Sequence, residues 1–513
     1  MRAFAALCRS FAAFVRSRSS CSGDRGGGAC GKTGRSCGTG DGGDALSSPD
    51  CMRGRNAESE HKSCVSGRAQ CENTRTAIDG RVKVFVEAHG CTQNYGEARL
   101  MAGALTDRGH TLTASEEDAD AHVLVTCTVI ETTERKMVRR MTELAAYEKP
   151  LVVAGCMAAA QRERVLATVP RAKLVPPRKW PQIVELLGTG TSCGDRAASI
   201  ESASLGWYDA IVPIAQGCAG RCTYCITRVA RGRVSSSPVE ALVAQVRRHV
   251  EQGIREIKLT GQDTAAYGLD TGTNLAELLH AIAAIPGEFR VRVGMADPLT
   301  VYPIVDELIG AYASPRIFTF LHLPVQSGSD EVLAAMKREY TVAQFEEIVG
   351  AFRAAYPDMT LSTDVIVGFP GETDEQFELT LGLMERTRPE IVNVTRFSPR
   401  AGTPAATMPH QMVGWRVKER SRRLTRLRFR ISKEIHDRFV GCEQAALVTE
   451  PGKMGTMLAR TPEYRQVVLR EAPPLGEFVR VHIDIARETD LLGHVVPNGL
   501  YTPVQIHPGS PVV

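Results

Sequence analysis

The sequence has no apolar run long enough to cross a membrane, so we expect a soluble protein that does not span one. We also expect no secretory leader, and 513 residues make a chain too large for a fold that depends on disulfides. Neither sign of charge dominates, because the formal net charge is +4. These absences exclude a membrane protein and a small disulfide scaffold, and they favour reduced cysteines that bind metal.

The first eighty residues lack apolar periodicity and are rich in Gly, Ser and Arg, which predicts a disordered extension over 1–80. Seven of the fifteen cysteines fall in this segment without regular spacing, and we assign them no role. The first twenty residues contain arginines and no acid, which is compatible with a transit peptide or with an unstructured extension. We expect a cytoplasmic protein, with a mitochondrial one as the alternative.

The remaining sequence predicts two α/β domains followed by one β domain. Strand-like and helix-like segments alternate over 81–190, which predicts a doubly wound parallel sheet. After a weak linker at 188–204, six strand-like segments separated by helical runs fill 205–434. Six units are too few to close an eight-fold barrel, so we expect a partial (β/α)6 barrel. Short strands and turns over 435–503 predict a small antiparallel barrel.

Three cysteines, Cys218, Cys222 and Cys225, occupy the run GCAGRCTYCITRVARG with the spacing C-x3-C-x2-C. Three thiolates on one loop can hold three irons of a cubane 4Fe-4S cluster and leave the fourth iron open. An open iron is what the binding and reductive cleavage of S-adenosylmethionine (AdoMet) require. A zinc site is the alternative, but structural zinc sites use four ligands, and no fourth Cys or His lies nearby in sequence.

A second cysteine triad is spread along the first domain. Cys91, Cys127 and Cys156 each come just after a predicted strand, in VFVEAHGC, HVLVTC and LVVAGC. Parallel strands end at one edge of a sheet, so the topology places the three thiols on the same edge. Gly90 and Gly155 permit tight turns there. The alternatives are a second iron–sulfur cluster and three ordinary buried cysteines.

The two triads and the domain order resemble the radical AdoMet methylthiotransferase family over about residues 82–500. Further matching stretches are LTGQDTAAYG at 259–268, LHLPVQSGSDEVLAAMKREYT at 321–341, STDVIVGFPGET at 362–373 and RFSPRAGTPAA at 396–406. GCTQNYGEARLMAG and CTYCITRVARG are most similar to the archaeal and eukaryotic branch. That branch methylthiolates C2 of N6-threonylcarbamoyladenosine at position 37 of tRNA.

The resemblance implies two 4Fe-4S clusters, held by the two triads, and two AdoMet molecules. It implies AdoMet contacts from Gly261, Gln262, Asp263, Ser362 and Asp364. It also implies a low-potential electron donor, a sulfur donor and a tRNA anticodon loop as partners.

The terminal barrel would be the RNA-binding TRAM domain of that family. The very basic helix before it, at 415–434, suits phosphate contacts, and we assign these to Arg420, Arg423, Arg426 and Arg430.

Three alternatives stay open at this point. In the first, the substrate is isopentenyladenosine in tRNA or an aspartate of a ribosomal protein. In the second, the protein is an RNA-binding iron–sulfur redox sensor. In the third, it is a single-cluster enzyme whose N-terminal triad is structural. An AdoMet-binding region such as GQDT argues against the sensor, because an electron carrier needs no AdoMet pocket.

Overall fold

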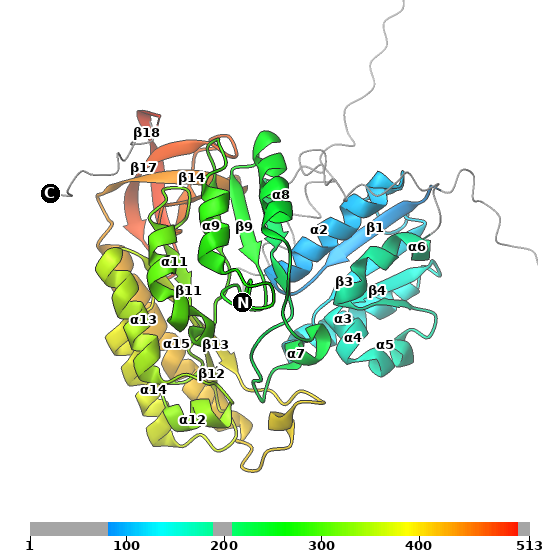
Figure 1. Ribbon diagram of the computed structural model, residues 1–513, viewed down its shortest axis with the longest axis horizontal. Coiled ribbons are helices and arrows are strands. Elements are labelled where there is room, and N and C mark those ends of the chain that lie inside the picture. Colours follow the sequence, from blue (N-terminus) through cyan, green and yellow to red (C-terminus); the bar gives the residue numbers. More distant parts are fainter. Residues whose placement is uncertain (1–80, 188–207, 501–513) are drawn as a thin grey trace, which may run out of the picture.

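A computed structural model describes residues 81–187 and 208–500 of the chain, without the side chains of 498–500 (Figure 1). The expected extension over 1–80, with its transit segment, and the expected linker at 188–204 lie outside the described residues. Within the described ranges, every helix is too short or too polar to cross a membrane.

The N-terminal sheet contains five parallel strands in the order β2-β1-β3-β4-β5. They are β1 (Lys83–Ala88), β2 (Thr111–Thr113), β3 (Ala121–Thr126), β4 (Leu151–Gly155) and β5 (Lys173–Val175). The three longer strands match the sequence-based expectation. The three-residue strands β2 and β5 were not expected, because so short a segment carries too little alternation to stand out.

Helices cover both faces of this sheet, as a doubly wound fold requires. Val123 and Val125 of β3 point into the core formed with α2 (Thr92–Asp107) and α6 (Ile183–Leu187). Leu124 points to the opposite core, formed with α3 (Glu131–Ala145) and α5 (Arg162–Thr168). Two short helices, α4 (Cys156–Ala160) and α5, follow β4.

Six parallel strands form the expected partial barrel, as two three-stranded sheets ordered β10-β9-β6 and β11-β12-β13. One backbone bridge, between Val291 and Ile317, joins the two halves. The strands are β6 (Asp209–Pro213), β9 (Glu256–Thr260), β10 (Arg290–Val293), β11 (Phe320–His322), β12 (Thr360–Val367) and β13 (Ile391–Arg396). The covering helices include α8 (Val239–Glu251), α9 (Leu275–Ala283), α11 (Val305–Tyr312), α13 (Val342–Ala355) and α14 (Asp374–Thr387).

The basic helix α15 (Gly414–Asp437) leads from this barrel to a closed five-stranded barrel, ordered β14-β15-β16-β18-β17. Its strands are β14 (Glu443–Pro451), β15 (Met457–Arg460), β16 (Gln466–Leu469), β17 (Phe478–Ala486) and β18 (Leu491–Leu500). The expected antiparallel barrel is correct apart from one pair, since β16 and β18 run parallel.

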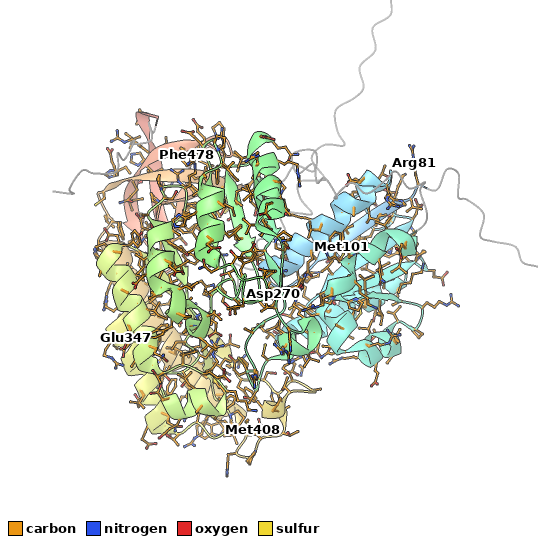
Figure 2. All side chains as sticks on the ribbon, viewed as in Figure 1. Arg81, Met101, Asp270, Glu347, Met408 and Phe478 are labelled. Carbon is orange, nitrogen blue, oxygen red and sulfur yellow. The ribbon has the colours of Figure 1, made fainter. Side chains whose placement is uncertain are left out.

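The small barrel docks on the amino ends of the large barrel's strands. Tyr464 packs against Phe318 and Phe320, and its hydroxyl donates to the carboxylate of Glu256 at the start of β9, at 2.8 Å. In Figure 2, Phe478 of this joint and Met408, which packs near Tyr224 of the cysteine loop, lie at opposite ends of the molecule. The small barrel and the loop that carries Tyr224 therefore occupy opposite ends of the large barrel.

A buried ionic group strengthens the same joint and makes it sensitive to pH. Glu390 accepts from His436 Nε2 of α15 at 3.0 Å and from Arg465 Nε of the small barrel at 3.0 Å. Burial opposes protonation of His436, but Glu390 and the Arg487 carbonyl raise its pKa above the usual value.

We predict that His436→Gln lowers the unfolding temperature chiefly at acidic pH. Because the pKa of His436 is higher in the folded protein, its contribution is complete below about pH 6.5 and is lost as pH rises through the raised pKa. Calorimetry of both proteins over a pH series measures this. The same difference in unfolding temperature between the two proteins at every pH would contradict the prediction.

Candidate functional site

The three N-terminal cysteines, Cys91, Cys127 and Cys156, follow the neighbouring strands β1, β3 and β4. Gly90 lets two of them approach: its φ is +115°, and a Cβ there would lie 2.4 Å from the Cβ of Cys127. Gly155 has a φ of +86° just before Cys156. The structure therefore brings the triad together at one edge of the sheet, and its role as a ligand set stays a prediction.

The chemistry of this triad fits an iron–sulfur cluster. All three are free thiols, with Cys127 and Cys156 buried and Cys91 exposed. Burial raises the pKa of Cys127 to about 12 and that of Cys156 to about 11, and the thiolate of Cys91 adds to both shifts. In the described ranges no three such side chains close around a single metal ion. A cubane cluster is wider than one ion and takes its thiolates at separate corners.

The second triad lies on a loop whose base is closed by two short antiparallel strands, β7 (Ala215–Gln216) and β8 (Ser235–Ser236). Two of its thiols flank Gly220, where a Cβ would lie 3.5 Å from Cys218 Sγ and 3.6 Å from Cys222 Sγ. Burial raises the pKa of Cys218 to about 12. The loop thus places two of its thiols on either side of Gly220, within ordinary contact distance of an added Cβ.

A buried arginine that the sequence analysis did not single out contacts this loop. Arg338 donates to Cys222 Sγ at 3.4 Å and to the Pro324 carbonyl at 3.1 Å. It also pairs with Asp297 at 2.6 Å. Arg338 lies inside the matching stretch 321–341, but nothing in its local pattern separates it from a surface arginine.

Two of the predicted AdoMet contacts lie beside the cysteine loop. Gln262 accepts from the Gly217 backbone at 2.7 Å, next to Cys218. Asp263 is buried and accepts from the backbone N–H of Asp297 at 3.0 Å. Burial, and then the charge of Asp297, raise the pKa of Asp263 to about 7. This carboxylate is tied to the turn after β10, and its contact with AdoMet stays a prediction.

The other predicted contacts lie on both halves of the large barrel. Gly261 directly follows β9, whereas Ser362 and Asp364 share one face of β12. Asp364 accepts from His322 Nε2 at 3.1 Å and from Asn393 Nδ2 at 2.7 Å. Burial alone would raise the pKa of Asp364, but these partners lower it. The barrel face therefore carries a stable carboxylate between two polar side chains.

One guanidinium connects the segments that carry the two triads. Arg231, 1% exposed at the end of α7 (Ile226–Arg231), pairs with both carboxylate oxygens of Glu97 and donates to Asn94 Oδ1 at 2.8 Å. Glu97 and Asn94 belong to α2, which begins directly after Cys91. The charge of Arg231 also opposes the rise in the pKa of Cys156 that burial causes. Burial alone would lower the pKa of Arg231, but Cys156 and Glu97 raise it.

The assignment of RNA contacts on α15 needs one correction. Arg420 is buried and pairs with Glu372 at 2.6 Å, so its charge is used inside the protein and it does not contact RNA. Arg423 and Arg430 are exposed but pair with acids of α14. Arg426 is exposed. The last three assignments stay predictions.

Comparisons with known proteins now bear on this arrangement. The Radical SAM superfamily matches residues 212–384, the Uncharacterized protein family UPF0004 matches 83–176, and the TRAM domain matches 437–496. The "Probable threonylcarbamoyladenosine tRNA methylthiotransferase" of Pyrococcus horikoshii is 41% identical over 428 residues, which cover 81% of this chain and 100% of that protein. The chain belongs to the threonylcarbamoyladenosine tRNA methylthiotransferase family.

The family extends to animals. The "Threonylcarbamoyladenosine tRNA methylthiotransferase" of Homo sapiens is 34% identical over 446 residues, covering 83% of this chain and 76% of that protein. A solved radical S-adenosylmethionine methyltransferase from Kitasatospora setae superposes with a TM-score of 0.45 and 14% identity, over 63% of this chain and 75% of that one. The expected family is confirmed, and its radical SAM domain implies a 4Fe-4S cluster and AdoMet.

We predict that Arg231→Met destabilises the protein by about 3–5 kcal/mol, because it leaves the Glu97 carboxylate buried without its partner. Denaturant unfolding measures the loss. Arg233→Met, at an exposed position two residues further on, is the matched control and is expected to have little effect. The double variant Arg231→Met/Glu97→Gln should recover part of the loss. Equal stability of wild type and Arg231→Met would contradict the prediction.

Proposed function

We propose that this chain methylthiolates C2 of N6-threonylcarbamoyladenosine at position 37 of tRNA, by radical AdoMet chemistry. The observation that carries the substrate assignment is the 41% identity over the whole length of a relative that bears this activity in its name. Two separate thiol triads agree with it, because the proposed reaction needs both AdoMet cleavage and a sulfur source.

The proposal divides the work between two clusters. Cys218, Cys222 and Cys225 would hold the cluster that supplies the electron for AdoMet cleavage. Cys91, Cys127 and Cys156 would hold a second 4Fe-4S cluster. Arg338 donates to a sulfur of the first triad, and the charge of Arg231 opposes the rise in the pKa of Cys156 in the second. Each guanidinium would balance negative charge on its cluster.

The other residues of the site would bind AdoMet, orient it and exclude water. Gln262 fixes the start of the cysteine loop through the Gly217 N–H, and Asp364 offers a carboxylate on the barrel face. Tyr224 packs edge-on against Phe369 at 6.4 Å between centroids and shields the loop on one side. We propose Gly261, Gln262, Asp263, Ser362 and Asp364 as the AdoMet-binding set.

The proposed partners are a tRNA anticodon loop, a low-potential electron donor and a sulfur donor. A loop nucleotide is unpaired, so it can be turned into a pocket without opening a helix. We propose functional units at 81–190, 205–434 and 435–503, and a cytoplasmic location with a mitochondrial alternative.

Expression in a host that lacks methylthiolated threonylcarbamoyladenosine tests the proposal. We predict that mass spectrometry of tRNA nucleosides shows the methylthio form with the wild-type chain and none with Cys222→Ala. Cys156→Ala should also give none, while the purified, reconstituted variant still cleaves AdoMet.

The other outcomes discriminate between the alternatives. AdoMet cleavage with no new nucleoside would move the substrate to isopentenyladenosine or to a ribosomal protein. An intact protein that does not cleave AdoMet would favour the redox sensor. Full activity of Cys156→Ala would show that the N-terminal triad is structural.

A further inference from the structure

Seven cations of α15 fall into two groups that the sequence alone does not separate. One group faces α14, whose acids neutralise it. Arg420 pairs with Asp374 at 2.6 Å and Arg423 pairs with Glu378 at 2.6 Å. The remaining pairs of this kind are Arg416 with Asp374 and Arg430 with Glu385. Four cations of the basic helix therefore pair with acids of the neighbouring helix α14.

The second group is exposed and unpaired. Lys418, Arg422 and Arg426 follow one another at four-residue intervals, which puts them in a row on one side of the helix. Across residues 81–187 and 208–500, no ion pair joins any of the three to a carboxylate. Glu419 is the only acid in the sequence between 415 and 426.

An exposed tryptophan extends this row at its amino end. Trp415 is 66% exposed and lies one turn before Lys418, with the Arg416 guanidinium over its ring at 5.8 Å. Burying so large an apolar ring against another surface is favourable, and an indole offers a flat face for a nucleobase. We call Trp415, Lys418, Arg422 and Arg426 the α15 strip.

The strip begins at the end of the barrel that carries the candidate site. Val417 packs on Gly368, which directly follows β12, and a Cβ on Gly368 would lie 2.6 Å from Val417 Cγ2. The other end of α15 reaches the small barrel, where His436 Nδ1 donates to the Arg487 carbonyl at 2.6 Å. At 1.5 Å per residue the strip covers about 17 Å of this path, with about 6 Å between successive cations.

We propose that the α15 strip binds a single-stranded segment of the tRNA substrate, with a base stacked on Trp415 and backbone phosphates on Lys418, Arg422 and Arg426. This inference rests on the proposed function for the identity of the RNA. Unpaired cations in a row attract a polyanion, and the aromatic ring at the end of the row favours a nucleic acid over an acidic protein. The position at the rim of the site suits nucleotides that flank the modified base.

Binding of a threonylcarbamoyladenosine-containing anticodon-arm RNA to the reconstituted full chain, measured over a salt series, tests the strip. Each strip cation changed to Gln should reduce the slope of log K against log salt by roughly one, and the triple variant by roughly three. Trp415→Ala should weaken binding about 10-fold, and Trp415→Phe should weaken it less. Arg386→Gln, an exposed, paired cation on α14, is the matched control.

Two comparisons separate the strip from its neighbours. Arg423→Gln and Arg430→Gln should change the slope less than any strip variant, because α14 acids already balance those charges. Iron content and AdoMet cleavage without RNA should be unchanged in all variants. An unchanged slope in the triple variant, or equal displacement of RNA by poly-glutamate, would overturn the proposal.

Failure of the strip and failure of the proposed function give different results. If wild type modifies tRNA but the triple variant keeps the wild-type slope, the strip is wrong and the function stands. If wild type binds the RNA through the strip but forms no methylthio nucleoside, the strip stands and the function is wrong. Absence of RNA binding by wild type would overturn the strip.

Discussion

The buried ion pair between Arg231 and Glu97 is the interaction on which the arrangement of the site depends. Glu97 lies on the helix that leaves Cys91, and Arg231 ends the helix that leaves Cys225. Both are almost fully inaccessible to solvent, so their desolvation must be repaid by well-placed partners. The remaining donors of Arg231 reach Asn94 and Gln216. A pair so fully satisfied fixes orientation, and here it fixes one triad against the other.

A series of charged groups also connects helix α2 to the large barrel and to the small barrel. Arg99 of α2 pairs with Asp209 at the start of β6 at 2.7 Å, and Lys258 pairs with both Asp209 and Glu256. Glu256 then accepts from Tyr464 of the small barrel. Helix α2, the large barrel and the TRAM barrel are thereby linked through the amino ends of β6 and β9.

The sequence predicted those features of the fold and the site whose signal lies within a short stretch of the chain. The triad of Cys91, Cys127 and Cys156 was predictable, because each thiol follows an apolar strand and parallel order puts strand ends together. The partner of Arg231 was not, because it lies 134 positions away in the chain. The same limit applied to α15, where charge density is visible in sequence but the acids of α14 that bury or balance Arg420 and its neighbours are not.

The two triads follow one plan. In each, a buried arginine acts on a cysteine and is itself paired with one carboxylate. Arg338 donates to Cys222 Sγ and pairs with Asp297, whereas the charge of Arg231 opposes the rise in the pKa of Cys156 and Arg231 pairs with Glu97. An iron–sulfur cluster with thiolate ligands is an anion, and hydrogen bonds to its sulfurs help to set its reduction potential. Arginine suits this position because it keeps its proton when buried and its planar donors serve a sulfur and a carboxylate together. The carboxylate limits the positive charge that the cluster meets. Each site therefore carries a fixed, partly balanced charge beside its thiols.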